Sequence, residues 1–290
     1  MKNNKLSIVI PTFNGLSLLK KHLPQVIKYS PAGTEIIIVD DGSIDNTVDW
    51  LKNDYPAVIC IHNPKNLGFT KSVNKAVSQV SSDFFLLLNN DVAVTKDYLS
   101  SALKYFEDPN IFAVTLNETH SSWPVITYSG KLNYTRAEDK SKAYYSGWAS
   151  GGSAIFRTNV WRDLGGFDDI YSPGYWEDID IGYRAWKAGY SIVWDPKSQV
   201  IHEHESTFNK YNRSHLNLIK QRNELIFNWK NITDSDLKAN HFWFLVSYTL
   251  RHPGYLKIII SALFALPLAK KTTVQKRTDK EVISLVNLPV

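Results

Sequence analysis

The feature that most limits the fold of this chain is an alternation of short apolar runs with longer amphipathic stretches over its first 115 residues. Apolar runs of about five residues are typical of strands buried on both faces, and the amphipathic stretches are typical of helices that cover them. The alternation predicts an α/β fold with a mostly parallel sheet. The expected strands are Leu6–Ile10, Glu35–Val39, Ala57–Ile61, Phe84–Leu88 and Ile111–Thr115, and the expected helices are Leu16–Tyr29, Asp45–Asn53, Gly68–Val80 and Lys96–Phe106.

Polar residues follow four of these strands at the point where each strand ends. Ligands of parallel sheets bind beside the carboxyl ends of the strands, so these residues are expected to share one crevice. One polar residue at a strand end is usually a turn former or a helix cap, but four such ends together indicate a binding site. The segments are Pro11–Gly15, Asp40–Asp45, His62–Gly68 and Asn89–Asp91.

The pattern changes after residue 116. Residues 117–150 are polar and aromatic, which predicts a loop region over the crevice with edge strands near Val125–Tyr128 and Ala143–Trp148. A helix is expected over Thr158–Leu164, and a second helix begins with the acidic residues that follow Trp176. A strand over Gln199–Ile201 follows it.

Residues 231–290 are expected to form a helical extension after the 1–230 domain. His241–Leu250 and Tyr255–Ala269 are apolar and aromatic, with basic residues between and after them. Both stretches are too short and too interrupted to span a bilayer. They favour helices that lie in the membrane interface, and packing on the domain or on a second subunit is the alternative.

Composition excludes several classes of protein. The single cysteine, Cys60, excludes an internal disulfide framework and a cysteine-based zinc site. The formal net charge of +5 suits nucleotide phosphates or an anionic membrane surface, and no nucleic-acid partner is expected. The apolar run at residues 6–10 is too short for the core of a signal peptide, so we expect a cytoplasmic protein.

Asp91 is the best candidate ligand for a divalent metal, Mn²⁺ or Mg²⁺, because hard cations prefer oxygen ligands. Asn89 and Asn90 beside it are candidates for an amide oxygen contact. A histidine after the last strand could add an imidazole nitrogen. Of the two nearby histidines, His202 is favoured over His204.

Other polar residues are candidates for catalysis and for nucleotide binding. Asp178 and Glu177 are candidate general bases, although acids at a helix start also stabilise the helix dipole. Asp40 and Asp41 could accept hydrogen bonds from a base or a ribose. Lys65 could approach a phosphate, with a solvated loop charge as the alternative reading.

As an ordered set, these motifs resemble glycosyltransferase family 2 over roughly residues 5–230. The resemblance implies a GT-A fold, with a nucleotide-binding half over about 1–115 and an acceptor half over about 116–230. It also implies transfer of a sugar, with inversion, from a nucleotide diphosphate-sugar to a hydroxyl group. The segments that carry it are Ser7–Gly15, Ile38–Thr47, Asn66–Phe69, Leu88–Asp91, Gly151–Gly152, Gly165–Asp168, Trp176–Asp178 and Val200–His202.

The resemblance also implies roles for single residues. Asp178 is the implied base, and Asp91 and His202 are the implied metal ligands. Asn89 replaces the first Asp of the family's Asp-x-Asp motif, and an amide is a weaker ligand than a carboxylate, so the metal is expected to rest mainly on Asp91, His202 and the diphosphate. The expected nucleotide-sugar pocket comprises Pro11, Thr12, Asn14, Asp40, Asp41, Lys65, Gly68, Asn89 and Asn90.

The expected product is a cell-surface polysaccharide or a lipid-linked glycan. The expected acceptor is a glycan or a polyprenyl-linked glycan at the inner face of the cell membrane. A homodimer is left open. A non-catalytic nucleotide-sugar-binding scaffold is the alternative, and the presence of Asp91, Asp178 and His202 favours the enzyme. A nicotinamide-dependent dehydrogenase is excluded, because Pro11–Gly15 is not a Gly-x-Gly-x-x-Gly loop.

Overall fold

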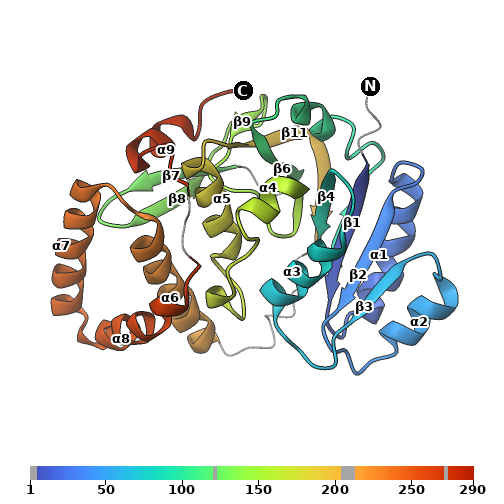
Figure 1. Ribbon diagram of the computed structural model, residues 1–290, viewed down its shortest axis with the longest axis horizontal. Coiled ribbons are helices and arrows are strands. Elements are labelled where there is room, and N and C mark those ends of the chain that lie inside the picture. Colours follow the sequence, from blue (N-terminus) through green and yellow to red (C-terminus); the bar gives the residue numbers. More distant parts are fainter. Residues whose placement is uncertain (1–4, 120–122, 204–212, 271–273) are drawn as a thin grey trace.

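The computed structural model describes residues 5–119, 123–203, 213–270 and 274–290. Within these ranges, nine strands form one sheet in the order β3-β2-β1-β4-β10-β6-β11-β5, and β9 pairs with β11 (Figure 1). The strands are β1 Leu6–Thr12, β2 Glu35–Asp40, β3 Ile59–His62, β4 Phe84–Leu88, β5 Val92–Val94, β6 Ile111–Glu118, β9 Tyr144–Tyr145, β10 Ser153–Arg157 and β11 Ser191–His202.

The sheet is mostly parallel, as predicted. Strands β1 to β4 pair in parallel, and so do β6 and β11. The antiparallel strand β10 lies between β4 and β6. Strands β5 and β9 also run antiparallel to β11. Six strands therefore point their carboxyl ends at one edge of the sheet, where the predicted crevice would lie.

Alternate residues of β1 show why the apolar runs are continuous. Ile8 and Ile10 pack with Leu19 and Leu23 of helix α1 on one face of the sheet. Val9 packs with Val73 of helix α3 on the other face. Both faces of the strand are covered, so both sets of alternate residues are mostly apolar, and the buried Ser7 hydroxyl hydrogen-bonds with Glu35 and Ser82.

Most of the predicted helices are present. Helix α1 has its predicted bounds, and α5 begins with the predicted acidic residues. The chain forms the helices α1 Leu16–Tyr29, α2 Thr47–Asp54, α3 Phe69–Gln79, α4 Thr158–Asp163, α5 Glu177–Lys187, α6 Arg213–Asn231, α7 Ser235–Arg251, α8 Leu256–Ala265 and α9 Asp279–Leu285, and short 3-10 helices at Ala102–Glu107, Asp169–Tyr171, Pro253–Tyr255 and Leu266–Leu268.

Two local predictions are wrong. The α-helix expected over Lys96–Phe106 is a series of turns and the 3-10 helix Ala102–Glu107, because Asp97 has a left-handed backbone with φ of +61°. The edge strand expected over Ala143–Trp148 is only β9, since the chain turns where the Ser146 hydroxyl donates to the carbonyl of Trp148. The other expected edge strand is β7 (Pro124–Tyr128), which pairs with β8 (Leu132–Arg136) in a separate two-stranded sheet.

The C-terminal part of the chain packs back onto the rest. Helix α8 lies against α6, and Asn287 N donates to the carbonyl of Tyr145 beside the sheet. Asp279 is fully buried and accepts a hydrogen bond of 2.8 Å from Lys187 at the end of α5. No helix in the described ranges is both long enough and apolar enough to cross a membrane.

Candidate active site

A cavity of about 340 Å³ lies at the carboxyl ends of β1 and β4 and reaches the start of α5. It unites segments from both halves of the chain. Ten of the thirteen predicted site residues line it: Pro11, Thr12, Asp41, Gly68, Asn89, Asn90, Asp91, Glu177, Asp178 and His202. The remaining lining residues are Phe13, Asn66, Phe69, Ser72, Ser150, Gly151, Gly152, Pro173 and Tyr175.

Asp41 fixes the loop that leads into α3. Its Oδ1 accepts a hydrogen bond of 2.8 Å from Leu67 N, and its Oδ2 accepts one of 2.9 Å from Gly68 N. Asn63 Nδ2 also donates to Oδ1, at 3.0 Å. Most of the hydrogen bonds that this carboxylate can accept therefore hold this wall of the cavity in place.

Three predicted pocket residues lie outside the cavity lining. Asp40 is fully buried and accepts hydrogen bonds from Ser43 and, at 2.8 Å, from His62 Nδ1. Asn14 Oδ1 accepts from Ile44 N at 2.9 Å, and the Lys65 side chain is exposed. Asn14 thus joins the loops after β1 and β2, Asp40 joins the loop after β2 to the end of β3, and their contact with a nucleotide stays a prediction.

Asp91 and His202 meet at one end of the cavity. His202 Nε2 lies 3.0 Å from Asp91 Oδ1, and its Nδ1 lies 3.3 Å from Glu118 Oε1. Burial alone would lower the pKa of His202, but its hydrogen bonds to the two carboxylates and their charges raise it to about 9. His204, the other histidine considered, lies outside the described residues.

Sequence reasoning missed Glu118, which ends β6. Its Oε1 also accepts hydrogen bonds from Ser150 and Ser153, at 3.1 and 2.7 Å. Burial raises the pKa of Glu118, but the hydrogen bond with His202, the His202 charge and the hydrogen bonds from Ser153 and Ser150 together outweigh it, and the pKa falls below its usual range. Its place at the carboxyl end of a strand, as for Asp91, is a signal that could have found it.

The pair formed by Asp91 and His202 fits a divalent metal. Cis ligands of a six-coordinate ion with bonds of about 2.1 Å lie about 3 Å apart, which is the separation of Asp91 Oδ1 and His202 Nε2. Within the described ranges, no group of three His, Cys, Asp or Glu residues could hold a metal ion. An ion here would therefore complete its coordination with substrate oxygens and water, as Mg²⁺ commonly does.

Asp178 and Glu177 begin helix α5 at the other side of the cavity. Asp178 Oδ2 accepts a hydrogen bond of 3.3 Å from Gly151 N. Burial raises the pKa of Asp178 above its usual range, and the backbone donors only partly offset this. Burial and the neighbouring Asp178 charge also raise the pKa of Glu177, whose Oε2 has no hydrogen-bond partner among the described residues.

Gly151 and Gly152 lie between Asp178 on one side and the Asp91–His202 pair on the other. The backbone of Gly151 bonds Asp178, and a Cβ on Gly152 would lie 2.5 Å from Asn89 Nδ2 and 3.3 Å from His202 Cε1. Only glycine allows this close approach. The two glycines thus bring the acidic start of α5 and the Asp91–His202 pair into one cavity.

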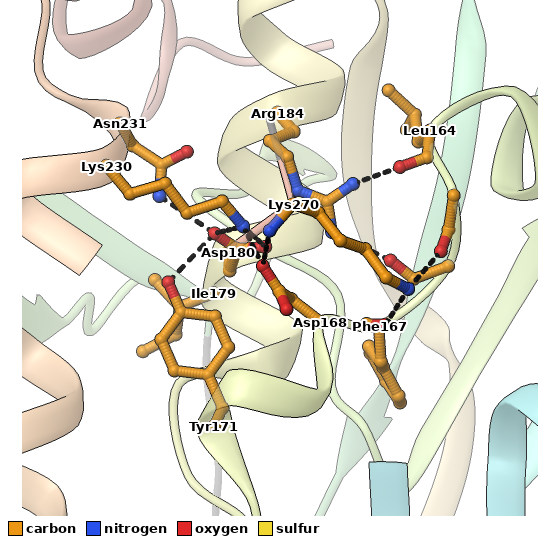
Figure 2. Close-up of polar contacts among 12 residues, drawn as sticks. Leu164, Phe167, Asp168, Tyr171, Ile179, Asp180, Arg184, Lys230, Asn231 and Lys270 are labelled. Carbon is orange, nitrogen blue, oxygen red and sulfur yellow. Dashed lines mark hydrogen bonds and ion pairs between the residues drawn. The ribbon is translucent and has the colours of Figure 1, made fainter. Parts of the chain in front are cut away.

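A buried polar network fixes helix α5 in place (Figure 2). Asp180 is fully buried and accepts hydrogen bonds from Arg184 Nε at 2.7 Å, Asn231 Nδ2 at 2.8 Å and Tyr171 Oη at 2.9 Å. Lys230 Nζ lies 2.9 Å from Asp180 Oδ1 and 2.7 Å from Asp168 Oδ2. The network joins α5, α6 and the turn before α5.

The fold and the arrangement of this cavity agree with a known family. The family model of glycosyl transferase family 2 matches residues 7–165, more than half of the 290 residues. The chain belongs to glycosyl transferase family 2. The solved structure of GalNAc-T7 with UDP, GalNAc and Mn²⁺ is similar, with a TM-score of 0.63 and 16% identity over 86% of this chain and 58% of that one. The expected GT-A fold is confirmed.

Curated relatives of this family 2 chain are named glycosyltransferases. The pre-mycofactocin glycosyltransferase of Mycobacterium tuberculosis (strain CDC 1551 / Oshkosh) is 26% identical over 69% of this chain. The chain spans 43% of that relative's length. The N-acetylglucosaminyl-diphospho-decaprenol L-rhamnosyltransferase of the same strain is 23% identical over 73% of this chain and 80% of its own length.

We predict that Asp180→Asn lowers the free energy of unfolding by about 3–5 kcal/mol at pH 7, because it leaves buried cations without their charge partner. Although burial raises the pKa of Asp180, Arg184 and Lys230 lower it to about 2, so its stabilising effect is present above about pH 4 and is lost toward pH 2. Urea unfolding from pH 7 to pH 2 should therefore show the two proteins converge at low pH.

The matched control is Asp236→Asn, which breaks an exposed ion pair with Lys280 and should leave the unfolding midpoint unchanged. A constant difference between parent and Asp180→Asn across the whole pH range would contradict the network's charge role.

Proposed function

We propose that this family 2 protein transfers a sugar, with inversion at the anomeric carbon, from a nucleotide diphosphate-sugar to a hydroxyl group of a glycan or lipid-linked acceptor. The observation that carries the proposal is the joining of Asp178 and the Asp91–His202 pair in one cavity across Gly151–Gly152. An inverting displacement needs a base beside the acceptor and stabilisation of the departing diphosphate on the opposite side. The cavity supplies residues suited to both tasks.

Asp178 is the proposed general base. Its carboxylate takes the proton of the attacking acceptor hydroxyl while the bond from the anomeric carbon to the diphosphate oxygen breaks. Burial raises the pKa of Asp178, which makes it a stronger base than an exposed aspartate. Glu177 lines the same cavity beside Asp178.

Asp91 and His202 are the proposed ligands of a divalent metal, Mn²⁺ or Mg²⁺. When bound, such an ion offsets the negative charge that develops on the leaving diphosphate. His202 must bind it as neutral imidazole, so metal binding would release the proton that Asp91 and Glu118 hold on the ring. The Asn89 side chain lies beside Gly152 and offers an amide instead of a carboxylate, so Asp91 is the proposed carboxylate ligand of the metal.

A non-catalytic scaffold that binds nucleotide-sugars is the alternative function. It would need the nucleotide side of the cavity but no base with a raised pKa. The buried start of α5, with its pair of acids, is costly for a protein to keep unless the acids have a task. This feature favours the enzyme.

We propose that the protein meets its acceptor at an anionic membrane surface, the inner face of the cell membrane. The decaprenol-linked substrate in the name of one relative points to such a lipid-linked acceptor. Helices α7 and α8, at the side of the molecule away from α2 (Figure 1), each expose one apolar stripe. The stripes comprise Phe242, Trp243, Val246 and Leu250 on α7, and Leu256, Ile260, Leu263 and Phe264 on α8.

Charge supports this surface. The sequence has no acidic residue between Asp236 and Asp279, while α7 and α8 carry the exposed basic residues Lys238, Arg251 and Lys257. Trp243 is 66% exposed and Phe264 is 82% exposed, which is unfavourable in water and favourable in a lipid interface. Acceptor transfer for a cell-surface polysaccharide or lipid-linked glycan would then occur next to the lipid.

We predict that Asp178→Asn lowers turnover by about 10²–10⁴-fold and leaves donor binding unchanged, because the base acts only on the acceptor proton. In the parent, kcat/KM should fall with decreasing pH at a pH above about 3.9, the ordinary pKa of aspartate, since the raised pKa protonates the base early. Release of nucleoside diphosphate from UDP-, dTDP- and GDP-sugars measures turnover and its dependence on pH. Asp163→Asn, an exposed acid, is the control, and parental turnover by Asp178→Asn would sink the assignment.

We predict that Asp91→Ala weakens Mn²⁺-dependent binding of a nucleoside diphosphate by at least about tenfold, while binding without metal is unchanged. Calorimetry with UDP, dTDP and GDP, with and without Mn²⁺, measures this difference. The control is Asp83→Ala, an exposed acid directly before β4, whereas Asp91 follows the end of β4. This variant should bind the nucleotide as the parent does. Unchanged affinity of Asp91→Ala in Mn²⁺ would count against the metal site.

We predict that the double variant Trp243→Asp, Phe264→Asp binds anionic phosphatidylglycerol vesicles at least about tenfold more weakly than the parent, because both exposed side chains lose their apolar contact with lipid. Co-sedimentation measures the binding, and Ile27→Asp on α1, 40% exposed, is the control. Failure of the parent to sediment, together with a dimer that the double variant disrupts, would show that the stripes bind a second copy instead.

A further inference from the structure

The chain that leads into the two acids of α5 has an unfavourable backbone. Tyr175 and Trp176 have φ values of +71° and +81° and are consecutive residues other than glycine. A left-handed backbone is unfavourable for a residue with a side chain, because Cβ lies too close to the following carbonyl oxygen. Such a conformation persists only where the surrounding contacts impose it. Because Glu177 and Asp178 follow directly, whatever imposes this turn also sets where the two carboxylates point.

Asn223 of α6 makes the contacts that hold this turn. It is fully buried, and its Nδ2 donates to the carbonyls of Tyr171, Gly174 and Tyr175 at 3.0, 3.1 and 2.9 Å. Arg222 fixes the amide from the other side, with Nε donating to Asn223 Oδ1 at 3.0 Å. This pattern leaves one orientation for the amide, because only the nitrogen can donate to carbonyls.

Arg222 adds a second hold on the same turn. Its Nη2 donates to the carbonyl of Ser172 at 3.0 Å and to that of Ile170 at 3.3 Å. Five carbonyls between residues 170 and 175 thus receive hydrogen bonds from two adjacent residues of α6. Buried carbonyls without donors are costly, so the turn cannot change shape without losing these bonds.

We propose that Asn223 is a positioning residue for sugar transfer: it holds the left-handed turn at Tyr175–Trp176, so that Asp178 faces the acceptor across the cavity. The proposal rests on the assignment of Asp178 as the base. Asn223 itself is absent from the cavity lining, so it acts through the turn. A displacement of a catalytic group by about 1 Å can lower the rate by about 10²-fold.

Asn228 offers a matched comparison on the same helix. It is 3% exposed, its Nδ2 donates to Glu224 O at 2.8 Å, and its Oδ1 accepts from Leu132 N at 2.9 Å. It therefore holds the β7–β8 hairpin and makes none of these bonds to the turn before α5. Both residues are buried asparagines of the same volume, although the Asn223 side chain takes part in more hydrogen bonds than that of Asn228. A general loss of stability should affect both variants, and a loss of positioning only one.

The test compares Asn223→Ala, Asn228→Ala and the parent by hydrogen exchange and by turnover. In Asn223→Ala, amides of residues 172–180 should exchange at least about tenfold faster. In Asn228→Ala the faster exchange should appear around residue 132 instead. Turnover, followed as nucleoside diphosphate release from UDP-, dTDP- and GDP-sugars with Mn²⁺, should fall about 10²-fold in Asn223→Ala and less than about threefold in Asn228→Ala.

The affinity for UDP, dTDP or GDP should stay within about threefold in both variants, since the nucleotide side of the cavity is built on other strands. Asn223→Ser, which keeps one donor, should fall between parent and Asn223→Ala, and it serves if the alanine variant does not fold. Parental exchange at 172–180 in Asn223→Ala, or equal losses of turnover in the two alanine variants, would overturn the proposal. Parental turnover in Asp178→Asn would instead contradict the base assignment, and the exchange result would still stand by itself.

Discussion

The buried carboxylate of Asp180 is the interaction on which the candidate site depends most. A buried charge is costly unless cations and hydrogen-bond donors surround it, and the donors to Asp180 come from distant parts of the chain: Tyr171 before α5, Arg184 within α5, and Lys230 and Asn231 at the end of α6. Lys230 also binds Asp168, which in turn accepts a hydrogen bond from the backbone N–H of Lys270. Helix α5 can therefore take its place only when α6 and the segment after α8 are packed against it.

The same helix holds two carboxylates with opposite properties two residues apart. Burial raises the pKa of both, but Arg184 and Lys230 bring that of Asp180 down to about 2, while that of Asp178 stays above its usual range. The difference arises because, in the part of the chain that the structure describes, Asp178 receives only backbone donors and has no paired cation. One carboxylate is thus committed to holding the helix, and the other stays able to take a proton. The turn held by Asn223 lies directly before both.

Much of the candidate site follows from the polar residues at strand ends, because the carboxyl ends of parallel strands meet at one edge. This reasoning placed Asp41 and Asp91 in one cavity, which also includes Asp178, an acid predicted from its place at a helix start. It missed contributions that depend on distant pairing: Glu118 is identified only by its contact with His202, and Asn223 only by the carbonyls it bonds. Helix α6 was not predicted, since its partners lie on α5 and α8 rather than on the sheet. The helix expected over Lys96–Phe106 was wrong because one left-handed residue, Asp97, interrupts it.

The proposed function requires this cavity to bind a nucleotide diphosphate-sugar together with a divalent metal. The most direct test is thermal unfolding of the purified protein against a panel of UDP-, dTDP- and GDP-sugars, each with Mn²⁺, with Mg²⁺ and with a chelator. A ligand at about 100 times its Kd stabilises the folded state by about 2.7 kcal/mol, which is a readable shift in Tm. We predict stabilisation by one nucleotide class, and only when the metal is present. An unchanged Tm with every donor and both metals, or an equal shift with the chelator, would contradict it.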